Sequence, residues 1–259
     1  MTRPTLLFIS QFAQPGTYNK ALWRRVQGED DETVPILALM DALAVTPAVN
    51  VRTIRAHEGE RLPDDLGGID AVILGGSFAS VADDYPWQRA IARFLAAWRA
   101  TGKPLLGICG GHQIMTTVLG GRVERSPHGP EFGSLPVTPT TAGAAHPLFE
   151  GFEDGALFHF GNFDRVVEPS AGSVVLATRP NLPAAALDHG GAWVSVQFHP
   201  EITCDRMATC WAELDPSKAA AYRFIPGCER MILNFIRSAG LLDDAVRPRL
   251  TDERLDQVP

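Results

Sequence analysis

The chain has little cysteine, and its cysteines are not spaced to bind metal or to cross-link the fold. Only four occur among 259 residues, and none form a Cys-x-x-Cys pair: Cys109, Cys204, Cys210 and Cys228. A disulfide-rich scaffold or a zinc site needs closely paired cysteines. We therefore expect reduced thiols, no metal site and no cofactor.

An excess of positive charge and long hydrophobic runs are also missing. Lys and Arg total 23 against 30 Asp and Glu, a net charge of −7, whereas a surface for nucleic acid must be cationic. The apolar run from Leu6 to Ile9 is too short for a signal peptide or a membrane span. We expect a cytoplasmic protein that binds neither nucleic acid nor membrane.

The composition is typical of a globular protein with a large core. Hydrophobic residues make up 45% of the chain, and the mean hydropathy is −0.01. Helical patterns at 36–44 and 86–100 alternate with short apolar segments that indicate buried strands, at 5–10, 49–54, 71–74 and 104–108. This alternation predicts an α/β fold with a mostly parallel central sheet, helices on both faces and ligands at the carboxyl ends of the strands.

Beyond residue 122 the pattern changes to short strands and turns. An antiparallel meander that extends the sheet is expected from strands at 133–138, 156–160, 173–178, 184–187 and 193–198. An amphipathic helix at 231–239 closes the domain, and residues 202–227 are a candidate cap over the site. We expect one domain over residues 1–242 and a charged tail over 243–259.

The most informative segment is Gly107 to Gln113, where a buried strand stops at Cys109 and two glycines follow. In a nucleophile elbow the reactive residue lies on a strained turn between a strand and a helix, and glycine neighbours leave room for that backbone. The N-terminus of the helix favours the thiolate, which is the nucleophilic form. Taken alone, an inert half-buried cysteine is the more common case.

A second motif, at 193–201, gives this cysteine partners. The alternation along the strand places His199 and Glu201 on one face of its end. A carboxylate beside an imidazole fixes the tautomer and stabilises the imidazolium. The alternative is a solvent-facing strand end, but together with Cys109 the pair completes a Cys-His-Glu triad.

These two motifs resemble the signatures of the class I (triad) glutamine amidotransferase domain: a Gly-Ile-Cys-x-Gly-His-Gln elbow and a Gln-Phe-His-Pro-Glu strand end. The segment Gly75-Gly76-Ser77 is similar to the oxyanion loop of that family. Segments 83–87 and 102–104 resemble its GMP-synthetase-like and gamma-glutamyl-peptidase-like branch. Two motifs in the correct order are far more specific than either alone, and the resemblance covers residues 5–201.

The resemblance implies a catalytic role for each matching residue. Cys109 would attack the side-chain amide carbon of glutamine and form a gamma-glutamyl thioester. His199 would act as acid and then as base, with Glu201 orienting it. The backbone N–H groups of Gly76 and Gly110 would form the oxyanion hole.

The resemblance also implies substrate-binding residues. Gln113 matches the family residue that binds the amino-acid end of glutamine, although a polar residue in the first turn of a helix can equally be structural. Gly75 and Ser77 belong to the loop that faces the substrate. Glu131 is a candidate for the substrate ammonium, but an exposed loop glutamate is more often only solvated.

Other histidines are expected to lie outside the chemistry. His112, inside the elbow motif, is assigned a structural role, and three more are expected at the surface: His57, His146 and His189. One segment departs from the family pattern, because relatives place a Ser-His-x-Asp or Trp-His-Gly-Asp sequence where this chain has Phe158 to Asp164. The acyl-donor and acceptor preference therefore stays open.

Two enzymatic functions fit these residues. The first is a glutaminase that releases ammonia for a separate synthetase or amidating enzyme, since we expect no fused ATP-using domain. The second is a stand-alone gamma-glutamyl hydrolase or peptidase that acts on a larger gamma-glutamyl compound. A non-catalytic partner-binding module of the same fold is a third alternative, disfavoured by the intact triad, and a different family with an elbow cysteine is a fourth, disfavoured by the Gln-Phe-His-Pro-Glu end.

Overall fold

A computed structural model describes residues 3–28 and 30–243, so all of the expected tail beyond residue 243 lies outside the described residues. The strands are β1 (Thr5–Ser10), β2 (Asn50–Arg55), β3 (Ala71–Leu74), β4 (Leu105–Ile108), β5 (Arg122–Arg125), β6 (Glu131–Pro136), β7 (Thr138–Pro139), β8 (Leu157–Asn162), β9 (Asp164–Glu168), β10 (Val174–Arg179), β11 (Leu182–Asp188) and β12 (Trp193–Val196). The α-helices are α1 (Lys20–Gln27), α2 (Thr33–Ala42), α3 (Pro86–Ala100), α4 (Gly110–Val118), α5 (Thr141–Ala144), α6 (Cys204–Ala212) and α7 (Arg230–Ser238). Short 3-10 helices are η1 (Ala56–Glu58), η2 (Val81–Asp83), η3 (Pro147–Phe149) and η4 (Pro216–Ala221).

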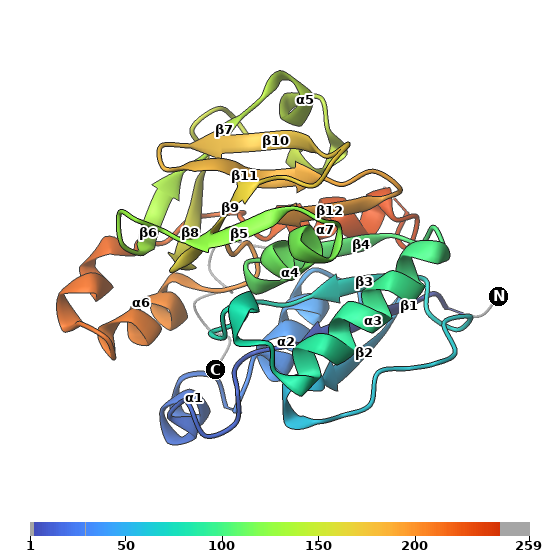
Figure 1. Cartoon of the computed structure of the whole chain (residues 1–259), viewed down its shortest axis with the longest axis horizontal. Helices are drawn as coiled ribbons and strands as arrows, with labels where there is room; N and C mark the ends of the chain where they lie inside the picture. Colours follow the sequence, from blue (N-terminus) through green and yellow to red (C-terminus); the bar gives the residue numbers. More distant parts are fainter. Residues whose placement is uncertain (1–2, 29, 244–259) are drawn as a thin grey trace.

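The central sheet has the strand order β2-β1-β3-β4-β12-β11-β10-β7 (Figure 1). The first five of these strands are parallel to one another, and the pairs β12–β11, β11–β10 and β10–β7 are antiparallel. The predicted α/β fold, with a mostly parallel sheet and an antiparallel extension, is therefore confirmed.

The predicted meander is only partly right. β10, β11 and β12 follow one another through antiparallel pairs, but β6 pairs with β8 and β5 with β9 in two separate two-stranded sheets. β12 also pairs in parallel with β4, which precedes it by more than 80 residues in the sequence. Alternation along a segment indicates a strand, but it does not identify the strand's partner.

The sheet is covered on both faces, as the sequence predicted. Alternate residues of β1 point to opposite faces: Leu6 and Phe8 pack in the cluster that includes α2 and α7, whereas Leu7 and Ile9 pack with α3 and α4. All four side chains are at most 1% exposed. None of the helices in the described residues is both long and apolar enough to cross a membrane.

Four neighbouring parallel strands end at the same edge of this sheet. Gln11 follows β1, Gly75 follows β3, Cys109 follows β4 and Gln197 follows β12. Ladder hydrogen bonds continue past the strand ends, from the Cys109 N–H to the Val196 carbonyl (2.8 Å). Residues far apart in the sequence therefore meet where an α/β sheet usually binds its ligand.

Candidate active site

The turn at Cys109 has the strained backbone of a nucleophile elbow. Cys109 adopts φ 50° and ψ −102° immediately before the first residue of α4, a conformation that a residue with a side chain rarely adopts. A Cβ at Gly107 would overlap the Met115 sulfur, and one at Gly111 would overlap the carbonyl oxygen of Leu74. Glycine at both positions lets β3, β4 and α4 approach closely enough to hold this turn.

His199 and Glu201 form a nearly buried ion pair beside the cysteine. His199 Nδ1 lies 2.7 Å from Glu201 Oε1, and their side chains are 12% and 10% exposed. Burial of the ring opposes its protonation, but the Glu201 carboxylate, followed by negative charge on the Cys109 sulfur and hydrogen bonds to both groups, outweighs burial and holds the pKa of His199 well above its ordinary value. The geometry therefore favours an imidazolium next to the sulfur.

The cysteine sulfur also has an amide neighbour that the sequence did not point to. Gln197 Nε2 donates to Cys109 Sγ at 3.5 Å, and both side chains are buried. The amide group of Gln197 is held in turn by Gln113 Nε2, which donates to Gln197 Oε1 at 3.2 Å. A positioned N–H donor stabilises negative charge on sulfur. Strand alternation predicted that Gln197 lies on the same side as His199, but the sequence did not assign it a contact with the sulfur.

The candidate oxyanion donors lie on two loops that pack against each other. A Cβ built on Gly76 would lie 3.0 Å from His199 Cε1 and 3.8 Å from Cys109 Cβ. A Cβ on Gly110 would lie 2.7 Å from the Ser77 nitrogen, so Ser77 offers a further N–H at this place. None of these three N–H groups has an acceptor within residues 3–28 and 30–243, and all remain free to bind a ligand.

The glycine loop, Gly75-Gly76-Ser77, is held in place by hydrogen bonds to the carbonyl oxygen of Gly75. Gly75 O accepts hydrogen bonds from Gln11 Nε2 (2.8 Å) and from the Gly111 N–H (3.1 Å). No cis peptide occurs in the described residues, and in a trans peptide the C=O and the following N–H point in opposite directions. The two donors therefore set the direction of the Gly76 N–H, and sequence patterns gave no signal for this role of Gln11.

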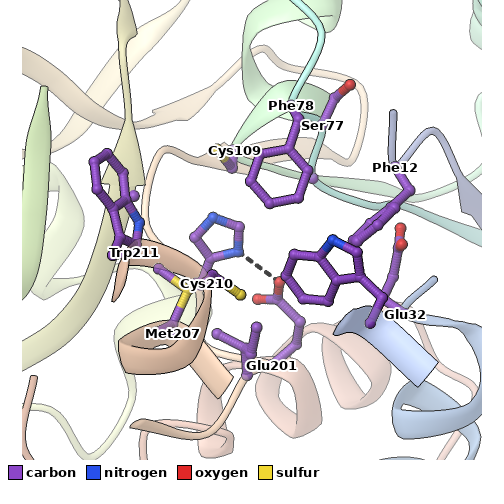
Figure 2. A pocket seen from close by; sticks show the side chains of 14 residues that line it. Phe12, Glu32, Ser77, Phe78, Cys109, Glu201, Met207, Cys210 and Trp211 are labelled. Carbon is purple, nitrogen blue, oxygen red and sulfur yellow. Dashed lines mark hydrogen bonds and ion pairs between the residues drawn. The ribbon is translucent and has the colours of Figure 1, made fainter. Parts of the chain in front are cut away.

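Two pockets meet at Cys109. One lies on the side of His199 and Glu201, and its walls are mostly apolar and aromatic (Figure 2): Phe12, Trp23, Phe78, Ile202, Met207 and Trp211. The other has mostly polar walls: Ser77, Ser80, Gln113, Arg125, Asn162 and Asp164. The sulfur thus has chemically different surroundings on its two sides.

The structure brings most of the predicted site residues together, with two exceptions. Gln113 and Ser77 line the polar pocket, although the Gln113 amide already donates to the Asp164 carbonyl at 2.9 Å. Gly75 lines neither pocket, because a Cβ there would face Glu32 Oε1 at 2.7 Å. Glu131 is also absent from both pockets, and its carboxylate binds the Arg179 guanidinium instead. The two pockets at Cys109 therefore give no support to substrate roles for Gly75 and Glu131, and these roles stay predictions.

The unassigned segment 202–227 contributes a wall of the apolar pocket. Ile202, Met207 and Trp211 come from it, the last two on α6. α1 contacts α6 and contributes Trp23 to the same pocket. This geometry agrees with the prediction that residues 202–227 cap the site. The sequence gave no pattern that identified which residues of the segment face the pocket.

Of the four histidine predictions, those for His57 and His189 were wrong, that for His112 agrees with the structure, and His146 is half-buried. His112 is fully buried, with Nδ1 2.7 Å from Ser195 Oγ, and burial lowers its pKa to about 3, as expected for a structural residue. His57 and His189, expected at the surface, are 3% and 6% exposed. Their polar sequence neighbours fold over them, and each finds a hydroxyl partner, Ser10 for His57 and Ser195 for His189.

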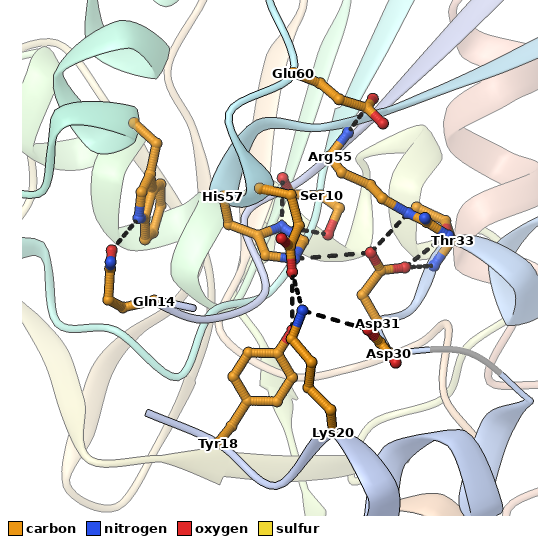
Figure 3. A network of polar contacts seen from close by, with 12 residues as sticks. Ser10, Gln14, Tyr18, Lys20, Asp30, Asp31, Thr33, Arg55, His57 and Glu60 are labelled. Carbon is orange, nitrogen blue, oxygen red and sulfur yellow. Dashed lines mark hydrogen bonds and ion pairs between the residues drawn. The ribbon is translucent and has the colours of Figure 1, made fainter. Parts of the chain in front are cut away.

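His57 belongs to a buried polar network behind the site (Figure 3). Its Nδ1 lies 3.2 Å from Ser10 Oγ and its Nε2 3.7 Å from Asp31 Oδ2. Asp31 also pairs with Arg55 Nε at 3.0 Å. The network joins the end of β1 to the start of α2.

No group of three or more possible metal ligands occurs in the described part of the chain.

Comparison with known proteins places this geometry in a family. Residues 38–213 match the family model for glutamine amidotransferase class-I. The GMP synthase [glutamine-hydrolyzing] of Aeropyrum pernix is 35% identical over 189 residues, which cover 72% of this chain and 31% of that protein. The enzyme of the same name from Geobacillus kaustophilus is 32% identical over 186 residues, with 71% and 31% covered. The chain spans about a third of the length of these relatives.

Solved structures show the same fold. A glutamine amidotransferase from Thermotoga maritima matches with a TM-score of 0.71 at 18% identity, over 92% of this chain and 99% of that one. A glutamine amidotransferase from Methylobacillus flagellatus matches with a TM-score of 0.62 at 18% identity, over 93% and 92%. With the family model covering most of the sequence, the chain belongs to the class-I glutamine amidotransferase family and is GMP-synthase-like.

Proposed function

We propose that this protein hydrolyses a glutamine or gamma-glutamyl side-chain amide through a thioester on Cys109. The observation that carries the proposal is the elbow thiol beside the His199–Glu201 pair, whose atoms lie 2.7 Å apart. The curated relatives are named as glutamine-hydrolysing, and the same chemistry accounts for the arrangement here.

In the first step the Cys109 thiolate attacks the amide carbon, and the carbonyl oxygen becomes an oxyanion. N–H groups from Gly110 and from Gly76 or Ser77 would stabilise it, and losing one such donor typically costs roughly 10²–10³ in rate. His199 gives its proton to the departing nitrogen as the carbon–nitrogen bond breaks. With glutamine as substrate, ammonia leaves and a gamma-glutamyl thioester remains.

In the second step His199, now neutral, takes a proton from water, whose oxygen attacks the thioester carbon. The carbon–sulfur bond breaks, and glutamate and the Cys109 thiolate are released. Glu201 keeps the imidazole oriented through both steps. We propose that a synthetase or amidating enzyme receives the ammonia, because the curated relatives are named as glutamine-hydrolysing GMP synthases.

Labelling and turnover test this proposal together. The protein is treated with a glutamine-mimicking diazoketone, the adduct is mapped, and ammonia release from glutamine is measured for wild type, Cys109→Ser and Cys204→Ser. We expect an adduct on Cys109, loss of turnover in Cys109→Ser, and wild-type turnover in the control, because Cys204 lines neither pocket at Cys109. An adduct on any other cysteine would refute the assignment.

A second candidate function is hydrolysis of a gamma-glutamyl compound larger than glutamine by this chain alone. The apolar pocket beside His199, which extends well past the sulfur, favours it. Comparing ammonia release from glutamine with cleavage of gamma-glutamyl peptides separates the two, since peptide turnover without glutaminase activity would reject the ammonia-donor function.

A further inference from the structure

We propose that the apolar pocket beside His199 is a subsite for the amine part of a gamma-glutamyl amide, and that this amine carries an uncharged, apolar group. This inference rests on the proposed function and specifies its substrate class. It adds a binding role for Trp211, Met207 and the aromatic side chains opposite them.

The position of His199 decides which pocket receives the amine. The group that protonates the leaving nitrogen must lie within hydrogen-bonding reach of it, so the amine leaves on the side of His199. His199 and Glu201 line the apolar pocket and are absent from the polar one. The polar pocket, with Gln113 and Arg125, is left for the amino-acid end of the substrate.

The apolar pocket is too large for ammonia alone. Fourteen residues line it, whereas a molecule the size of water or ammonia contacts only a few groups. Cys109 lies in its wall together with His199, so the space begins at the reacting atoms and extends away from them (Figure 2). A substituent on the leaving nitrogen would fill it.

The walls of this pocket are held in place by aromatic packing. Trp211 stacks between Phe132 and Phe163, with centroid distances of 5.3 and 5.4 Å. On the opposite side Phe12 meets the rings of Trp23 (4.9 Å) and Phe78 (5.3 Å) edge to face. Walls that are fixed before binding lower the entropic cost of ordering an apolar ligand.

The charge in the pocket points to an uncharged amine substituent. Within the described part of the chain, no Lys or Arg lines it, so an anionic group would have no partner there except the His199 ring. Besides Glu201, the acid that lines the pocket is Glu32, and both of its carboxylate oxygens are inaccessible. Burial, and then the nearby Asp31, raises the pKa of Glu32 well above its ordinary value, and its inaccessible oxygens offer no surface contact to a cationic substituent.

The reaction balances without any further reactant. The Cys109 sulfur bonds to the gamma carbon, the carbon–nitrogen bond breaks, and the nitrogen takes the His199 proton and leaves as a free primary amine. Water then replaces sulfur on the carbon, and glutamate is released. The amine departs through the apolar pocket.

Four substrates test the proposal on the full chain: glutamine, gamma-glutamyl-benzylamide, a gamma-glutamyl amide of 1,4-diaminobutane and a gamma-glutamyl amide of 4-aminobutanoate. We expect kcat/KM for the benzylamide to exceed that for glutamine and for both charged amides by about tenfold or more, since burying even one or two methylenes discriminates at this level. A benzylamide no better than glutamine, or a charged amide as the best substrate, would overturn the proposal.

Two variants locate the effect. Met207→Gln keeps the side-chain length but makes it polar, and should lower kcat/KM for the benzylamide about tenfold more than for glutamine. Phe78→Ala, at a residue that is 55% exposed, should act in the same direction if Met207→Gln fails to fold. The control is Leu214→Gln, at an exposed residue just beyond α6 that does not line the pocket, and its kinetics should match wild type.

The outcomes also separate this proposal from the proposed function. Cys109 labelling and glutamine turnover, without preference for the benzylamide, would refute the subsite alone. No turnover of any of the four substrates and no label on Cys109 would refute both.

Discussion

Replacing Gln11 with alanine tests whether the glycine loop must be held for catalysis. Gln11 is 2% exposed, and its Nε2 is one of the two donors to Gly75 O, at 2.8 Å. The second donor, the Gly111 N–H at 3.1 Å, survives the substitution. The Gly76 N–H cannot be removed by mutation, so Gln11 gives access to its direction.

The size of the effect follows from the loss of one hydrogen bond, from Gln11 Nε2 to Gly75 O. A hydrogen bond contributes a net of about 0.5–1.5 kcal/mol, so losing it would lower the population of the aligned loop, and kcat, by about 2- to 13-fold. Complete loss of an oxyanion donor would cost roughly 10²–10³, and the remaining Gly111 bond prevents that. KM for glutamine should change little, because the oxyanion forms only in the transition state.

Steady-state kinetics of glutamine hydrolysis measure both parameters. Gln14→Ala is the matched control, since the Gln14 side chain accepts from Trp87 Nε1 at 2.9 Å, a bond that does not involve the glycine loop. Thermal melting of both variants corrects for lost stability. A kcat for Gln11→Ala equal to that of Gln14→Ala, or a change confined to KM, would refute the reasoning.

Three further predictions follow from named contacts. Glu201→Gln removes the carboxylate that favours the protonated ring, so the pKa of His199 falls and the alkaline limb of the pH profile of kcat/KM should move to lower pH; an unmoved limb would contradict this. Asp31→Asn loses the charge facing Arg55 Nε at 3.0 Å and should lower the free energy of unfolding in urea by about 1–3 kcal/mol. Glu131→Gln should leave glutamine kinetics at wild-type values, because its carboxylate binds Arg179 outside both pockets, and a raised KM would restore its substrate role.

The elbow and the strand end could be predicted because each is a local pattern. Gly107, Cys109 and Gly111 specify a turn through the volume that glycine leaves free, and the strand-end motif predicted the His199–Glu201 contact, although both residues lie past the end of β12. Both segments follow buried strands, so a parallel sheet was enough to bring them to one edge.

The residues that sequence missed are fixed by contacts across the fold. Gln11 reaches Gly75 from 64 positions away, and nothing around it in the chain marks that bond. His57 lies in a polar segment, yet Ser10 and Asp31 fold over it and supply the polar partners that a buried imidazole requires. The partner of Glu131 is likewise remote in sequence, since its carboxylate binds Arg179 on β10.

The architecture separates the reacting groups from the groups that select the amine. Cys109, Gln197 and the glycine loop follow strands of the central sheet, while Trp23 and Trp211 come from α1 and α6, which lie together at one end of the molecule (Figure 1). α6 packs against β8 of the smaller β6–β8 sheet at Gly161, where a Cβ would lie 2.6 Å from Met207 Cε and 2.7 Å from Trp211 Nε1. Substitutions on α6 can therefore alter amine preference without moving the triad, because the strand ends are held by the sheet's own hydrogen bonds.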